Sequence, residues 1–232
     1  MSTLYVIRHG QASYGQADYD RLSPLGEEQA RLLGAHLAEG PPLDLVFVGP
    51  RRRQRQTADH IVRAARRREA EVVAALDEYP AEAILRQALP ELLRDADPEA
   101  RGTFASDPLG VPTDPRRFQV LFERVMKRWL TGELLLEDTE SFAEFAGRVR
   151  LALHEIMAAA GRGRTVAAVT SAGPTGIALQ MALELSDAVA LKQSWVVANT
   201  GMTEIKFRGD EMTLVAFNAL PHLHERRLVT FR

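Results

Sequence analysis

The sequence predicts an α/β protein with a mostly parallel sheet flanked by helices and an antiparallel hairpin near the C-terminus. Three observations predict this class. An unbroken apolar run at residues 4–7 and a mostly apolar run at 43–48 are typical of strands buried on both faces of a parallel sheet. These runs alternate with stretches of helical apolar spacing, which indicates β-α-β units. Near the C-terminus, residues 203–208 and 212–217 flank a glycine turn at 209–210, as the two strands of a hairpin do.

Length and composition are those of an ordinary globular protein, because 232 residues with 46% apolar and 26% charged content suffice for one domain with an inserted lobe. The net charge of −2 gives no reason to expect a nucleic-acid partner. Apolar runs fall short of the roughly 18 residues of a membrane span, and the N-terminus lacks a signal-peptide pattern. We therefore expect a cytoplasmic protein without a membrane partner.

Two residue biases limit which chemistry the chain can carry. It has no cysteine, which excludes disulfides, a thiol nucleophile and a thiolate metal site. Of its 29 basic residues, 26 are arginine, so an arginine is informative only at a defined spacing.

The first third of the chain predicts a β-α-β-α-β order. A helix is expected to begin at Ser23-Pro24, because serine is a good N-cap and proline suits the first helical turn. The strand at 43–48 leads into an arginine-rich helix from about residue 51 to 68, and a third strand is expected at 71–76. This order implies parallel strands joined by right-handed crossovers.

Residues 79–138 are predicted to be a mostly helical insertion within a single domain of residues 1–232. Leucine and phenylalanine recur at helical spacing on both sides of 95–115, a stretch rich in Pro, Gly and Asp. The insertion follows directly on the end of a strand, so we expect a lid that lines one side of a pocket and selects the substrate. After it, a capping box at 141–144 opens a helix, and 165–170 is a fourth buried strand.

Polar side chains follow each of the four predicted parallel strands. Arg8 and His9 follow the first strand, Arg53 lies just past the second, Glu78 follows the third and Ser171 follows the fourth. Because the carboxyl ends of parallel strands meet at one edge of a sheet, we expect these side chains to converge. Histidine is a nucleophile, arginine neutralises phosphoryl oxygens, and a carboxylic acid protonates a leaving oxygen. The sequence therefore predicts a site for phosphoryl chemistry.

Four motifs carry a resemblance to a known family. They are Arg8-His9-Gly10, Leu22-Ser23-Pro24-Leu25-Gly26, Gly49-Pro50-Arg51-Arg52-Arg53 with Gln56-Thr57, and Asn218-Ala219-Leu220-Pro221-His222-Leu223. Together they resemble the histidine phosphatase superfamily, also called phosphoglycerate-mutase-like. The resemblance implies that His9 becomes phosphorylated. It implies that Arg8 and Arg53 bind the phosphoryl group and that Glu78 donates a proton. A small phosphorylated substrate, inorganic phosphate as product and no metal or organic cofactor are implied as well.

The chain departs from the family's pattern within this site. Ser171 stands where most members carry a second histidine, and Gly49 stands where serine is usual. Gln11 follows Arg-His-Gly in place of the more usual glutamate, and Gly15 stands where phosphoglycerate mutases have asparagine. A serine donates one hydrogen bond but carries no charge. We therefore expect a slow phosphatase in which Ser171 and Gln11 are neutral contacts of the phosphate.

Several residue assignments leave an alternative open. Arg53 competes with three neighbouring arginines, any of which a solvated helix surface would also explain: Arg51, Arg52 and Arg55. Glu78 competes with Asp77 for the role of proton donor. Ser171 is either a phosphate contact or only a helix cap.

The function that the sequence favours is hydrolysis of a phosphomonoester through a phosphohistidine at His9. A phosphoglycerate-type mutase, which returns the phosphate to substrate instead of water, is one alternative. The other is a non-catalytic phospholigand-binding or regulatory protein that kept the fold. An aryl phosphate assay with and without His9→Ala separates the hydrolase from the binding protein.

Overall fold

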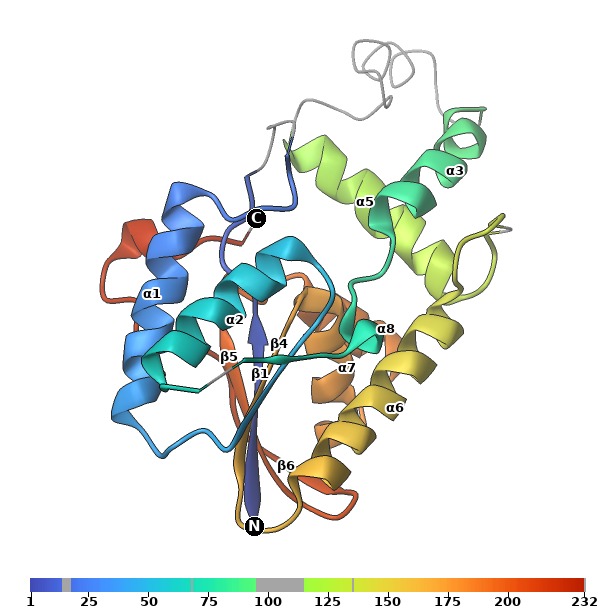
Figure 1. The fold of residues 1–232 in the computed structure, drawn as a ribbon. Coiled ribbons are helices and arrows are strands. Elements are labelled where there is room, and N and C mark those ends of the chain that lie inside the picture. The colour runs from blue at the N-terminus through green and yellow to red at the C-terminus, as the bar shows by residue number, and fades with distance from the viewer. Residues whose placement is uncertain (14–17, 68, 95–114, 135, 232) are drawn as a thin grey trace. The chain divides into compact units, whose positions relative to one another are not determined.

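The computed structural model describes residues 1–13, 18–67, 69–94, 115–134 and 136–231 (Figure 1). The chain divides into two compact units. The first, here called the core unit, comprises Met1–Glu78 and Ala146–Arg232, and the second, the insertion unit, comprises Tyr79–Phe145.

The core unit alternates strands and helices along the chain. Its strands are β1 (Ser2–Arg8), β2 (Leu45–Val48), β3 (Glu71–Val72), β4 (Thr165–Thr170), β5 (Met202–Arg208) and β6 (Glu211–Ala219). Its helices are α1 (Pro24–Glu39), α2 (Arg52–Ala64), the greater part of α6 (Phe142–Ala160), α7 (Ala172–Leu183) and α8 (Asp187–Ser194). Short 3-10 turns lie at Ala74–Leu76 and Arg226–Leu228.

The strands form one sheet in the order β3-β2-β4-β1-β5-β6. The pairs β1–β4, β2–β4 and β2–β3 are parallel, whereas β1–β5 and β5–β6 are antiparallel. Helices α1 and α2 cover one face of the sheet, and α6 and α7 lie on the other side (Figure 1). This arrangement confirms the predicted fold class, a mostly parallel sheet flanked by helices with a C-terminal hairpin.

The core beneath α1 and α2 consists of the apolar residues that the strand and helix patterns predict. Ile7 of β1, Leu33 of α1, Ile61 of α2 and Val169 of β4 all belong to one buried cluster. Burying a side chain of this size stabilises the fold by about 1.5 to 3 kcal/mol. The predicted start of α1 is confirmed, because the Ser23 hydroxyl accepts the Gly26 N–H at 3.0 Å.

The predicted strand at 71–76 is wrong in extent. Only Glu71 and Val72 pair with β2, and the Val73 N–H makes one further bond to the Val48 carbonyl at 2.8 Å. The chain then turns, and the Leu76 carbonyl accepts the Thr170 hydroxyl of β4 at 2.6 Å. In the second half of the predicted strand, this side-chain contact with β4 thus replaces backbone pairing with β2.

Two helices also differ from expectation. Helix α2 ends at Ala64 rather than near residue 68, and Arg66 has a left-handed φ of 53° that interrupts the helix. Helix α8 was not predicted. Its N-cap is Ser186, whose hydroxyl accepts the Val189 N–H.

The insertion unit contains α3 (Ala81–Arg94), α5 (Pro115–Leu130) and the first residues of α6. Its core is aromatic: the indole of Trp129 lies 5.3 Å from the rings of Tyr79 and Phe142. The Pro-, Gly- and Asp-rich stretch at 95–115 lies outside the described residues, except for Pro115. The role of residues 79–138 as a lid stays a prediction.

Candidate active site

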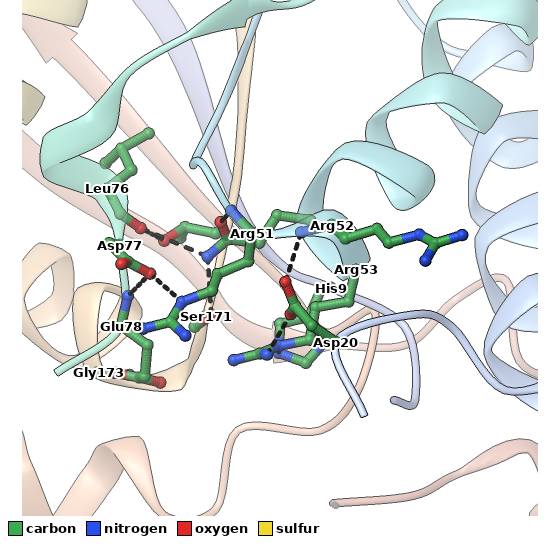
Figure 2. Close-up of polar contacts among 12 residues, drawn as sticks. His9, Asp20, Arg51, Arg52, Arg53, Leu76, Asp77, Glu78, Ser171 and Gly173 are labelled. Atoms are coloured by element: carbon green, nitrogen blue, oxygen red, sulfur yellow. Dashed lines mark hydrogen bonds and ion pairs between the residues drawn. The ribbon is translucent and has the colours of Figure 1, made fainter. Parts of the chain in front are cut away.

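The candidate site lies at the carboxyl edge of the parallel strands in the core unit. Arg8 pairs with Thr170 across β1 and β4, and Val48 pairs with Val169 across β2 and β4, so the three strands end at one level. Figure 2 shows the side chains that gather there: His9, Asp20, Arg51, Arg53, Asp77, Glu78 and Ser171. Such an edge is where open α/β sheets place ligands.

Three of the sequence motifs meet at Gly10. A Cβ at this position would lie 2.6 Å from the carbonyl oxygen of Gly26 in α1, so the turn after β1 requires glycine. The Gly10 N–H donates to the Thr57 hydroxyl at 3.0 Å, and that hydroxyl donates to the Arg53 carbonyl at 2.8 Å. Backbone contact among separate segments therefore explains why these motifs occur together.

The imidazole of His9 is buried, with 5% of the residue exposed. Its Nδ1 lies 2.6 Å from the Gly10 carbonyl oxygen, and its Nε2 lies 2.9 Å from Nε of Arg53. A carbonyl only accepts and an arginine only donates, so the proton is on Nδ1 and the lone pair is on Nε2. Burial, followed by the charges of Arg53 and Arg8, lowers the pKa of His9 well below its usual range. His9 is therefore neutral at physiological pH.

Arg53 is the cation in contact with His9. Only 7% of it is exposed, and besides donating to His9 it pairs with the Asp20 carboxylate at 2.5 Å. Asp20 also accepts the backbone N–H of Arg52 at 2.8 Å, at the start of α2. The ring of Tyr19 lies 5.5 Å from the Arg53 guanidinium carbon, within range of a cation–π contact. One terminal amino group of Arg53 has no partner within the described part of the chain.

The side chain of Arg8 donates to the backbone carbonyls of Val197 and Phe231. Its charge still lowers the pKa of His9, after burial and Arg53. Arg8 is therefore near enough to act on the site electrostatically, and its contact with a phosphoryl group stays a prediction.

The two acidic alternatives, Asp77 and Glu78, make different contacts. The Asp77 carboxylate pairs with Nε of Arg51 at 2.6 Å and accepts the Glu78 N–H at 2.7 Å. Both carboxylate oxygens of Glu78 lie 3.1 Å from the N–H of Gly173, at the start of α7. The backbone of this acidic pair is held by Arg148, whose side chain donates to the carbonyl of Asp77 at 2.9 Å. Glu78 thus lies where the helix N-terminus favours an anion.

Ser171 lies just after β4 and is almost fully buried. Its side chain makes no cap hydrogen bond to α7, although the residue is the N-cap by position. Instead its hydroxyl accepts Nε2 of Gln54 at 2.9 Å. The contacts of Ser171 therefore do not support the interpretation that it is only a helix cap.

Gln11 lies beside the site but makes other contacts. Its side-chain oxygen accepts the Ser23 hydroxyl at 2.8 Å, which supports the N-terminus of α1. Its backbone N–H donates to Gln29 at 2.8 Å. A phosphate contact by Gln11 stays a prediction. Gly15 lies outside the described residues.

A loop that precedes β5 holds the backbone of the Arg8-His9 pair. Asn199 Nδ2 donates to the His9 carbonyl at 3.2 Å, and the Thr200 N–H lies 3.1 and 3.2 Å from the carbonyls of Arg8 and His9. Thr200 has a φ of 57°, which is unusual for a β-branched residue. Its hydroxyl contacts Nε2 of His222 at 2.8 Å. The C-terminal motif thus supports the backbone of His9.

Sequence reasoning missed Asp20, Gln54 and Asn199, and it treated Arg51 only as a competitor of Arg53. Gln54 lies within a motif that drew attention to other residues. Asp20 lies in a polar loop, where one carboxylate is not distinguishable from its neighbours. No local pattern marks Asn199, because its contact with His9 joins residues far apart in the chain.

The described structure also has a hollow away from the candidate site. A hollow of about 820 Å³ lies between the end of α7 and the β5–β6 turn, at the opposite edge of the sheet. Two of its charged side chains, Arg208 and Glu211, pair at 2.8 Å. Within the described residues, no three His, Cys, Asp or Glu side chains are grouped to hold a metal ion. No helix in those ranges is long and apolar enough to cross a membrane.

Comparison with known proteins identifies the family. The family model of the histidine phosphatase superfamily (branch 1) matches residues 4–132 and 121–220. The chain is 26% identical over 236 residues to "Putative phosphoserine phosphatase 2" of Hydrogenobacter thermophilus, an alignment that covers 97% of this chain and 99% of that protein.

Two solved structures show the same fold. A mutant phosphoserine phosphatase of Entamoeba histolytica in complex with phosphoserine has a TM-score of 0.65 and 21% identity, over 96% of this chain and 100% of that one. A phosphoglycerate mutase of Bacillus anthracis has a TM-score of 0.63 and 17% identity, over 95% of this chain and 94% of that one. With a phosphoglycerate-mutase-like fold and a family model that matches most of its length, this chain belongs to the histidine phosphatase superfamily.

Proposed function

We propose that this protein hydrolyses phosphomonoesters through a phosphohistidine formed on His9. The tautomer of His9 carries the proposal. The Nδ1–H donates to the Gly10 carbonyl, so the Nε2 lone pair is directed toward Arg53, a cation suited to phosphoryl oxygens. The lowered pKa of His9, caused first by burial, keeps that lone pair free of a proton. Family membership and relatives named as phosphatases support the same function.

In the first step, Nε2 of His9 attacks phosphorus and the bond from phosphorus to the ester oxygen breaks. As Nε2 of His9 attacks, the Nε–H of Arg53 stops donating to His9 and donates instead to a phosphoryl oxygen, while Arg53 keeps its proton. Arg8 contributes positive charge. Glu78, as the carboxylic acid, gives its proton to the leaving oxygen. The negative charge of a phosphoryl group beside Glu78 favours the protonated acid.

In the second step, a water molecule attacks the phosphorus of the phosphohistidine and the phosphorus–nitrogen bond breaks. The Glu78 carboxylate takes the proton of that water, and inorganic phosphate leaves. The Ser171 hydroxyl donates one hydrogen bond to the phosphoryl group in both steps. The groups in this cycle are cationic or protic side chains of the chain itself, so the proposal requires no metal.

The proposed substrate is a small phosphorylated metabolite. Phosphoserine is the first compound to test, because the Entamoeba histolytica structure holds phosphoserine and the Hydrogenobacter thermophilus relative is named for it. A phosphoglycerate belongs in the same panel, because transfer of its phosphate to another hydroxyl would identify a mutase.

The test is single-turnover labelling with a phosphorus-labelled aryl phosphate in wild type, His9→Ala and His154→Ala. Wild type should form an acid-labile phosphoprotein that decays to inorganic phosphate. His9→Ala should lose the label and on the order of a thousandfold in rate. His154 lies on α6 with 43% of its side chain exposed, so His154→Ala should match wild type. EDTA should leave the rate unchanged.

Equal turnover in wild type and His9→Ala would contradict the proposal. Tight phosphate binding by wild type without any phosphoprotein would favour the non-catalytic binding protein instead.

A further inference from the structure

We infer that Arg51 is a further catalytic residue, whose guanidinium binds an oxygen of the transferring phosphoryl group beside Ser171. This inference rests on the proposed function. It concerns an arginine that the sequence could not separate from surface charges, and three observations on the core unit carry it.

The first observation is the direction of the Arg51 side chain. Its Nε pairs with Asp77 at 2.6 Å, and 38% of the side chain is exposed. Its two terminal amino groups have no partner within the described residues. Figure 2 shows the guanidinium beside Asp77 and Glu78. Asp77 therefore anchors one edge of the guanidinium and leaves the other edge open for an anion.

The second observation is electrostatic. Burial has the largest effect on the lowered pKa of His9, followed by Arg53 and Arg8, and the charge of Arg51 adds to the same shift. The carboxylates of Asp20 and Glu78 in turn act on Arg51. A charge that acts on His9 and Glu78 also acts on a phosphoryl group that moves between them.

The third observation is the support given by Gln54, a fully buried side chain. Its amide oxygen accepts the backbone N–H of Arg51 at 2.9 Å, and its amide nitrogen donates to the Ser171 hydroxyl at 2.9 Å. One amide thus fixes the start of the Arg51 side chain and orients the Ser171 hydroxyl. Since that hydroxyl accepts from Gln54, its own proton remains available to a phosphoryl oxygen.

The volume beside Ser171 is already filled. A Cβ at Gly49 would lie 2.3 Å from the Gln54 amide oxygen, so the glycine is required for Gln54 to be accommodated. The size of the side chain at each of the positions 49, 54 and 171 therefore limits the size that the other two positions can hold. An imidazole in place of the Ser171 hydroxyl would compete with Gln54 for space.

The chemistry requires a cation at this place. A neutral hydroxyl at Ser171 gives a phosphoryl group only a hydrogen bond, whereas a guanidinium gives charge and two parallel donors. Because Asp77 holds Nε of Arg51 in advance, little side-chain entropy remains to be lost on binding. With Arg8 and Arg53, Arg51 completes a set of three cations around the transferring group.

The test compares Arg51→Ala with Arg55→Ala, the removal of an exposed arginine of α2 four residues further along the chain. The probe is an aryl phosphate with an acidic leaving group, whose departure depends little on Glu78. Arg51→Ala should slow single-turnover formation of phosphohistidine by about a hundredfold. It should weaken orthovanadate binding in parallel. Arg55→Ala should leave both within about twofold of wild type.

Three further variants separate a contact from a structural effect. Arg51→Lys should recover part of the rate, because it restores the charge but not the fork of donors. Ser171→His alone should lower the rate, whereas Ser171→His together with Gln54→Ala should recover it, because the second change vacates the volume. Thermal melts confirm that each variant is folded.

The inference is overturned if wild type forms phosphohistidine and Arg51→Ala is as fast as Arg55→Ala. It is also overturned if Arg51→Ala loses rate while orthovanadate affinity stays at the wild-type value. If wild type forms no phosphohistidine, the proposed function fails and the assignment of Arg51 falls with it.

Discussion

Two buried histidines of the core unit are held in the neutral form. His9 lies among arginines, whereas His222 is buried with its Nε2 on the Thr200 hydroxyl and its ring 6.2 Å from the ring of His36. Burial, followed by the charges of His36 and His224, lowers the pKa of His222 to about 4. A histidine of this kind opposes protonation of the folded protein, so it makes folding sensitive to acid.

The free energy of unfolding should fall as the pH drops from 6.5 toward 4. In the unfolded chain His222 takes up a proton near its ordinary pKa of 6.5, whereas in the folded chain it does so only near 4. The unfolded state therefore binds more protons in this window, and stability rises with pH across it. The shift corresponds to about 3 kcal/mol, and His9 acts in the same direction.

Urea unfolding of wild type and His222→Gln at about pH 7 and about pH 4.5 measures this effect. Glutamine keeps a donor for Thr200 but does not titrate, so the variant should lose part of the pH dependence. His154→Gln is the matched control at an exposed histidine and should retain the wild-type dependence. An identical loss of stability in wild type and His222→Gln would contradict the assignment.

At the scale of elements, the end of β6 positions the end of β1 through the loop 196–201. The side-chain amide of Asn218 donates to one backbone carbonyl of this loop and accepts one of its N–H groups, both at 2.8 Å. A Cβ at Gly201 would lie 2.3 Å from the Asn218 amide oxygen. Since the same loop binds the His9 carbonyl, the C-terminal motif has a structural reason to accompany the first motif.

Replacing Asn218 should therefore cost stability in two separable parts. Asn218→Gly removes two hydrogen bonds and should lower the free energy of unfolding by about 2 kcal/mol. Asn218→Ala should cost about 1 kcal/mol more, because φ at this position is 53° and alanine disfavours the left-handed region. Urea unfolding at neutral pH measures both variants. Equal stability of the alanine and glycine variants would show that the backbone is free to change its conformation there.

At the scale of the whole molecule, local pattern predicted the elements that have a strong local sequence signal. The buried strands at β1, β2 and β4 appeared as unbroken apolar runs, and α1 began at the serine cap that the sequence indicated. The third strand was overestimated because its last carbonyl bonds to the Thr170 hydroxyl, a contact across 94 residues.

The candidate site likewise contains residues that a sequence rule predicts and contacts that no local pattern predicts. His9, Arg53 and Glu78 all follow strands, so the rule that ligands bind at the carboxyl ends of parallel strands predicted that these residues converge. The contact of Gln54 with Ser171 spans 117 residues, and the pair of Asp20 with Arg53 spans 33. Such pairs depend on which elements become neighbours in the sheet, which no local pattern specifies.

The candidate catalytic groups of the described structure all belong to the core unit, whereas the insertion unit has an aromatic core of its own. Chemistry at His9 should depend on the core unit, and selection of the substrate is proposed to depend on the insertion unit. A variant that loosens only the insertion unit should therefore affect large and small substrates differently.

Trp129→Ala is that variant, because the residue is 2% exposed and its indole N–H donates to the Glu140 carbonyl at 3.0 Å. Removing a buried tryptophan costs about 3 to 5 kcal/mol, here within the insertion unit. We expect kcat/KM to fall at least tenfold for the preferred phosphorylated metabolite and about twofold for a small aryl phosphate. Val120→Ala, at a position of α5 that is 70% exposed, is the control and should change neither. An equal fall for both substrates would mean that the insertion unit is needed to build the catalytic site itself, and its role in selection would have to be abandoned.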